Sequence, residues 1–141
     1  MEKIVECVPN FSEGRDPIVI DAIAGAVRSV PGVTLLSVEP AKDYNRCVVT
    51  FVGAPGPVKE AAFRATQKAA TLIDMREHTG EHPRIGATDV VPFVPVSGVT
   101  MEECVALSNE YGQRVATELR IPVYLYEEAA RTPERRNLAN I

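Results

Sequence analysis

Two spacings of hydrophobic residues divide the chain into expected strands and expected helices. Short runs rich in β-branched residues, each stopped by turn residues, predict strands over residues 4–8, 34–38, 46–52, 89–96 and 122–126. Apolar residues that recur three and four positions apart predict helices over residues 16–30, 57–72 and 100–119, with a terminal helix from Pro133 onward. Asp16 with Pro17 suits the start of the first helix, and Thr100 with Glu103 forms a capping box for the third.

The order of these elements indicates the fold. They follow one another as βαββαβ and then αβα, which is the split βαβ pattern of a ferredoxin-like α+β sheet with an extension. The polar link from Glu39 to Asn45 is short enough for an antiparallel hairpin. Pro92 and Pro95 cannot donate hydrogen bonds to a neighbouring strand, so we expect their strand to lie at an edge or to carry a bulge. Residues 1–141 are expected to form a single domain.

Composition narrows the class of protein. The chain has 141 residues, of which 45% are hydrophobic and 24% charged, the mix of a globular domain long enough for a core. A net charge of −4 argues against a nucleic-acid or anionic-membrane surface, and no apolar run approaches the roughly 20 residues that span a bilayer. The start lacks the pattern of a secretory signal. Cys7, Cys47 and Cys104 stand in apolar surroundings, so we expect buried free thiols and a cytoplasmic protein.

The stretch over residues 78–96 carries the densest candidate chemistry and contains both histidines of the chain. Histidine is the side chain whose unperturbed pKa, about 6.5, lies in the physiological range. His78 and His82 fit the H-x-x-E-H zinc signature, which needs a helix to bring the two imidazoles onto one face. Gly80 and Pro83 disfavour that helix, and no histidine remains as a third ligand. We therefore expect no metal.

The remaining side chains suit acid–base chemistry. The sequence contains no glycine-rich dinucleotide motif, no phosphate-binding lysine motif and no serine in a nucleophile elbow. His82 stands among acids and arginines, which suits general acid–base catalysis on a substrate that brings its own nucleophile. Arg84 follows a proline in a tight loop, where a rigid guanidinium would suit carboxylate recognition. The alternatives are a surface histidine in a turn and, for Arg46 and Arg84, solvated charges.

Several long blocks resemble one protein family along essentially the whole chain. They are VECVPNFSEG over residues 5–14, Asn45-Arg46, GEHPRIGATDV over 80–90, VPFVPV over 91–96, and PVYLYEEAAR over 122–131. On these blocks the chain resembles the N-terminal subdomain of glutamate formiminotransferase, the folate-dependent enzyme of histidine breakdown. The resemblance implies transfer of a formimino group between tetrahydrofolate and the amino group of glutamate.

The resemblance also implies an architecture and a site. Family members have a mixed sheet with helices on one face, the open face packs against a second subdomain, folate lies in a tunnel between the two, and the enzymes are commonly dimeric. The family's catalytic histidine falls on His82, which could deprotonate the attacking amine and protonate the departing folate nitrogen. Glu39, where the family usually has aspartate, could orient or charge-stabilise this imidazole. Asn10, Arg46 and Arg84 are expected to bind substrate.

Two functional hypotheses and two structural expectations follow. The chain stops near the end of the family's first subdomain, so it is either a formiminotransferase catalytic half or a non-catalytic, partner-dependent folate-binding half-domain. His82, Arg84 and Glu39 are expected to cluster at one rim of the sheet. The face without helices is expected to be apolar and buried by another copy of the chain or a second-subdomain partner, because the strands are apolar at nearly every position.

Overall fold

The computed structural model describes residues 2–41, 43, 45–73 and 88–120. The strands are β1 (Ile4–Cys7), β2 (Asn10–Phe11), β3 (Val33–Ala41), β4 (Arg46–Gly53), β5 (Thr88–Val90) and β6 (Phe93–Ser97). The helices are α1 (Pro17–Arg28), α2 (Pro55–Leu72) and α3 (Met101–Arg114), and α3 continues into a π-helical segment, η3 (Val115–Leu119). The strand predicted over residues 122–126 and the helix predicted from Pro133 lie outside the described residues.

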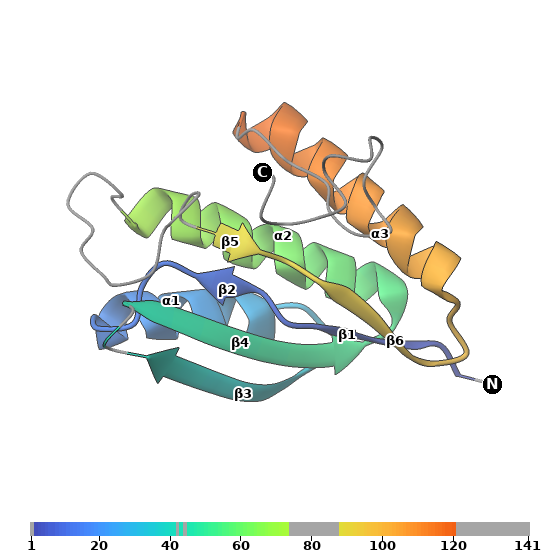
Figure 1. The fold of residues 1–141 in the computed structure, drawn as a ribbon, viewed down its shortest axis with the longest axis horizontal. Helices are drawn as coiled ribbons and strands as arrows, with labels where there is room; N and C mark the ends of the chain where they lie inside the picture. The colour runs from blue at the N-terminus through green and yellow to red at the C-terminus, as the bar shows by residue number, and fades with distance from the viewer. Residues whose placement is uncertain (1, 42, 44, 74–87, 121–141) are drawn as a thin grey trace.

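The six strands form one sheet with the connectivity of two split βαβ units (Figure 1). β4 pairs with β1 and β2 on one side and with β3 on the other, while β6 pairs with β1 and β5 with β2. Every one of these pairings is antiparallel. The described part of the sheet is therefore antiparallel throughout, without the parallel pairs that the expected mixed sheet implied. The α+β class and the βαββαβ order are confirmed.

Prolines divide two of the strands. β1 and β2 follow one line of the sheet and are separated at Pro9, and β5 and β6 are separated at Pro92. Neither proline has an N–H for the ladder, but both carbonyls still accept: Val8 N–H donates to Pro92 O at 3.2 Å, and Val49 N–H to Pro9 O at 3.1 Å. Among the described strands β6 pairs only with β1, with a register shift at Ile4 and Val5, so it has both the edge position and the irregularity that its prolines predict.

Helices cover one face of the sheet. α1 and α2 pack side by side on it, and α3 contacts α2 and β6 (Figure 1). The burial of β4 alternates accordingly: Cys47, Val49 and Phe51 are buried beneath the helices, whereas the residues between them are half-buried. Phe11 and Phe51 have no exposed surface and form the centre of the core with Val5, Ile23, Val27 and Val58. None of the described helices is long and apolar enough to cross a membrane.

Two helix starts follow the sequence signals, whereas α2, β3 and β2 differ from the prediction. The Asp16 side chain accepts from Ile18 N–H, and the Thr100–Glu103 capping box is present. α2 starts at Pro55 rather than at the predicted position 57. β3 runs on to Ala41 because β4 offers it backbone partners to the hairpin end, so Glu39 lies in a strand and not in a link. The predicted turn after Val8 contains β2, since buried Phe11 continues the sheet.

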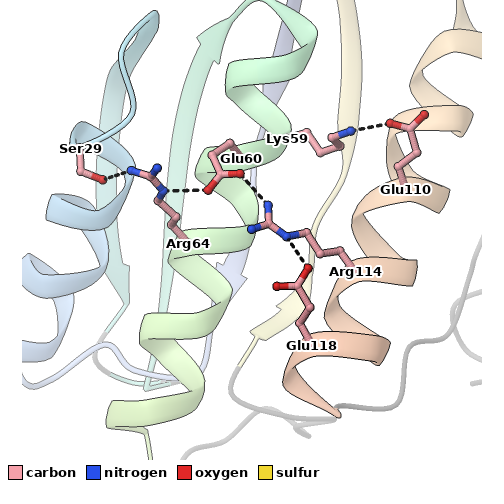
Figure 2. Close-up of polar contacts among 7 residues, drawn as sticks. All are labelled: Ser29, Lys59, Glu60, Arg64, Glu110, Arg114 and Glu118. Atoms are coloured by element: carbon pink, nitrogen blue, oxygen red, sulfur yellow. Dashed lines mark hydrogen bonds and ion pairs between the residues drawn. The ribbon is translucent and has the colours of Figure 1, made fainter.

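A polar network ties the helices together on their outer side (Figure 2). Glu60 of α2 accepts from Arg64 Nε at 2.8 Å and from Arg114 Nη1 of α3 at 2.6 Å. Arg64 also donates to Ser29 Oγ, at the end of α1, at 3.1 Å, and Arg114 donates to Glu118 at 2.9 Å. The Arg114 guanidinium in addition lies 3.7 Å from the centre of the Phe63 ring. These contacts fix the spacing of three helices that the sheet alone would not determine.

Candidate functional site

Two of the sequence-predicted site residues stand opposite the same residue of β4. Val48 is the partner of Asn10 in β2 and of Glu39 in β3. Paired residues in neighbouring strands project from the same face, so these side chains form one row across three strands. The neighbouring row, Phe11 with Cys47, is buried under the helices, which places the Asn10 and Glu39 row on the face that no described helix covers.

Arg46 joins this row from the start of β4. It precedes Val48 by two positions, and successive side chains of a strand alternate between faces, so both project from the uncovered face. Arg46 pairs with Ala41 at the turn end of the β3–β4 hairpin, diagonally next to Glu39. The structure therefore brings together Asn10, Glu39 and Arg46 at one end of one face. We call these three residues the rim cluster.

The polar groups of the rim cluster make few hydrogen bonds within the described part of the chain. Asn10 Nδ2 donates to Val8 O at 3.3 Å, and Ser37 Oγ donates to Glu39 Oε1 at 3.2 Å. Within the described ranges, no hydrogen bond or ion pair involves the Arg46 guanidinium. A guanidinium without a partner among the described residues, beside half-buried valine side chains, suits a ligand that combines an apolar ring with carboxylates.

The loop between β2 and α1 is held against the β3–β4 hairpin. Asn45 Oδ1 accepts from Gly14 N–H at 2.9 Å in a buried contact between residues 31 positions apart. Within the loop, Glu13 Oε2 accepts from Arg15 N–H at 3.0 Å and from Asp16 N–H at 2.9 Å. The segment that leads from Asn10 into α1 is thus fixed both internally and to the strand that carries Arg46.

Sequence reasoning missed the roles of Gly14 and Asn45. They occur in the first two of the blocks that carry the family resemblance, but only Asn10 and Arg46 in those two blocks were predicted to bind substrate. The available signal was positional: an Asn just before a strand suits a left-handed backbone, and the φ of Asn45 is 48°. Periodicity alone gave no reason to join it to a loop so far away in the sequence.

His82 and Arg84 lie outside the described residues, as does His78. The expected clustering of His82 and Arg84 with Glu39 therefore stays a prediction. In the described part of the chain, no group of three or more His, Cys, Asp or Glu side chains could hold a metal ion.

The three cysteines are buried free thiols, as predicted. Burial raises the pKa of the Cys47 thiol to about 11, although hydrogen bonding with the Glu39 backbone opposes the shift. Burial likewise raises the pKa of Cys7 well above its usual range and raises that of Cys104. A protonated thiol is a poor nucleophile at neutral pH, so burial disfavours a nucleophilic role for these residues.

Comparison with known proteins decides the family. Residues 4–141 match the family described as "Formiminotransferase domain, N-terminal subdomain". The chain belongs to this family. The whole chain aligns at 56% identity with the formimidoyltransferase-cyclodeaminase of Dictyostelium discoideum, and covers 26% of that protein. The whole chain also aligns at 50% identity with the glutamate formimidoyltransferase of Streptococcus pyogenes, and covers 47% of that protein. With the glutamate formimidoyltransferase of Thermoplasma acidophilum, 98% of the chain aligns at 52% identity and covers 46% of that protein.

The relatives are therefore transferases, and this subdomain spans less than half of their length. The family match confirms the resemblance drawn from the quoted blocks. Two of the three rim-cluster residues lie in those same blocks: Asn10 in the first, and Arg46 in the Asn-Arg pair. Glu39 lies outside the blocks.

Proposed function

We propose that this chain is the half of a formiminotransferase that holds the acid–base histidine and part of the folate site. The reaction is transfer of a formimino group between tetrahydrofolate and glutamate. The observation that carries the proposal is the rim cluster: three separate strands bring Asn10, Glu39 and Arg46 to one end of the uncovered face. The printed names of the two prokaryotic relatives, glutamate formimidoyltransferase, support the choice of reaction.

Each residue has a role in this proposal. Tetrahydrofolate supplies the ring nitrogen that carries the formimino group. His82 takes a proton from the attacking amino group and returns one to the departing nitrogen, as an imidazole with a pKa near 6.5 can do at neutral pH. Glu39 orients that imidazole or stabilises its charged form. Arg46, Arg84 and Asn10 bind the substrate, the two guanidinium groups through carboxylates.

A second protein surface completes the site in this proposal. The relatives are about twice as long or more, and the uncovered face of the sheet offers half-buried Val48 and Val52 for packing. A second subdomain, or another copy of the chain in a homodimer, would enclose the folate over the rim cluster. The competing function is a non-catalytic, partner-dependent folate-binding half-domain, which the short span of the chain relative to its relatives keeps open.

Single-turnover transfer together with folate titration tests the proposal. His82→Ala is expected to lower the rate by about a hundred- to ten-thousand-fold, because general acid–base catalysis contributes in that range. Folate affinity should change little, since the proton transfers occur only in the transition state. Arg46→Ala should have the opposite effect, in that it weakens substrate binding more than it lowers the rate of transfer.

The controls separate the two functions. The wild-type chain is assayed alone and with a second-subdomain protein supplied in trans. Folate binding without turnover in either arrangement would favour the non-catalytic half-domain. Near-normal turnover of His82→Ala would remove the histidine from the mechanism, and absence of both binding and turnover would exclude the transferase function for this chain.

A further inference from the structure

Two residues next to the rim cluster join its strands from outside the binding surface. We propose that Gly14 and Asn45 are positioning residues, which fix Arg46 relative to Asn10 and thereby set the affinity for a carboxylate-bearing substrate. The substrate class rests on the proposed function, whereas the positioning rests on contacts within the chain.

Asn45 contributes a backbone conformation and a side-chain acceptor at once. Its φ of 48° lies in the left-handed region, where Asn is tolerated far better than most residues with a side chain. Only 7% of its surface is exposed, and its Oδ1 accepts from Gly14 N–H at 2.9 Å. Since Arg46 is the next residue, whatever moves Asn45 also moves the guanidinium of the rim cluster.

Gly14 allows the loop to approach the hairpin closely, because there is no room for a side chain at this position. A Cβ on Gly14 would lie 2.5 Å from Arg46 N and 2.7 Å from Ala41 O, and closer still to Arg46 O. All three atoms belong to backbone of the β3–β4 hairpin, so none can rotate away as a flexible side chain would. The loop and the hairpin end are thus in direct contact, and a larger residue would force them apart.

The consequence for binding follows from how a carboxylate is held. A guanidinium and an amide that share one ligand gain affinity when their spacing is fixed in advance, because less freedom is lost on binding. Asn10 stays paired with Val48, so separating the loop from the hairpin would shift the end of β4 that carries Arg46 relative to Asn10 without removing either side chain. The expected effect is on the Michaelis constant rather than on the proton transfers assigned to His82.

Gly53 provides a matched control at the other end of β4. A Cβ there would also lie under 3.0 Å from a backbone oxygen, that of Gly32, but far along the strand from the rim cluster. Gly14→Ala and Gly53→Ala should therefore impose comparable steric conflicts on the same strand. Asn45→Gly removes the acceptor while keeping the left-handed backbone, and Asn45→Asp keeps an acceptor and tolerates that backbone.

The experiment measures kcat, KM and Tm for these variants in the protein that carries this chain, together with amide NMR spectra without substrate. Gly14→Ala and Asn45→Gly should raise KM about tenfold or more with kcat within about threefold, as expected when a charge-assisted contact is misplaced. Gly53→Ala should lower Tm with KM unchanged. Asn45→Asp should keep KM within about threefold of wild type. In the spectra, Gly14→Ala should shift the Asn10 and Arg46 amides more than Gly53→Ala does.

Each outcome has one meaning. An unchanged KM in Gly14→Ala, or an equal rise of KM in Gly53→Ala, would overturn the positioning role and leave only a structural one. If the wild-type protein neither transfers formimino groups nor binds folate, the proposed function fails, and the spectra alone decide the positioning. Equal shifts of the Asn10 and Arg46 amides in both alanine variants would then reject it.

Discussion

Arg46 and Cys47 are neighbours in the chain but meet opposite environments, because successive side chains of a strand point to opposite faces. Arg46 projects from the uncovered face with its donors free of described partners. Cys47 is 2% exposed and lies under the helices. The environment of a strand residue in this protein thus depends on which face of the sheet its side chain projects from, as well as on its residue type.

Thiol reactivity tests that contrast at the scale of single residues. With a pKa of about 11, Cys47 is about one part in a thousand thiolate at pH 8, and Cys7 and Cys104 are shifted in the same direction. We expect the folded protein to react with a thiol-specific disulfide reagent at least about a hundredfold more slowly than the denatured chain. Rapid labelling of all three thiols, with the native circular dichroism retained, would contradict their burial.

At the scale of elements, the helical layer depends on ion pairs that cross between helices. The Arg114 guanidinium, hydrogen-bonded to Glu60, is the main cause that holds the pKa of Glu60 below its ordinary value, and Arg64 adds to it. Arg114 receives the reciprocal shift, a raised pKa, chiefly from Glu60. The network spans α1, α2 and α3, so it sets how the helices sit on the sheet and not merely whether each helix forms (Figure 2).

The pH dependence of Glu60→Gln tests the network. A carboxylate with a lowered pKa stabilises the fold above its unfolded pKa, here about 4.5, and loses that contribution as the pH falls through the lower folded pKa. We expect Glu60→Gln to lose about 1 kcal/mol at pH 7 and much less at pH 3.5, measured by urea unfolding. Asp21→Asn, on the exposed surface of α1, serves as the control with little change at pH 7. A deficit of Glu60→Gln that is equal at both pH values would argue against the ion pairs.

At the scale of the whole molecule, the two faces of the sheet are unequal. One carries the helices and the core, whereas the other presents the rim cluster at one end and, farther along, valines together with Glu6 and Thr50. Val94 and Val96 of β6 are 41% and 56% exposed. Burial alternates along β1 and β4, so the residues that the structure describes cover only one face. The expected cover of the other face, by a second copy or a second subdomain, stays a prediction.

Sedimentation of the 141-residue chain tests whether a second copy of the chain covers this face of the sheet. We expect the chain to associate at micromolar concentration, because the exposed valines of this face favour burial against another surface. Val94→Asp should shift the chain to monomer by placing a charge on that face. Ile18→Asp, at an apolar residue of α1 that is 78% exposed, should leave association unchanged. A monomeric wild-type chain, or equal effects of the two variants, would refute association through this face.

The sequence by itself determined what depends on near neighbours in the chain. Proline positions predicted where the edge strand is interrupted, Asp16 and Thr100 predicted two helix starts, and the spacing of apolar residues predicted the helix faces. The quoted blocks identified the family, which the comparison confirmed. Such features could be read from the sequence because capping, periodicity and proline geometry act over a few residues.

Only the tertiary structure decided what depends on long-range pairing. Three features join segments that are far apart in the chain. They are the register that sets Asn10 and Glu39 opposite Val48, the extension of β3 to Ala41, and the contact of Gly14 with Asn45. Local patterns leave these open, because a one-residue shift in strand register exchanges the two faces while the sequence stays the same. Packing of the helices against Phe11, Cys47 and Phe51 buries one face and so selects the register that leaves the rim cluster on the other.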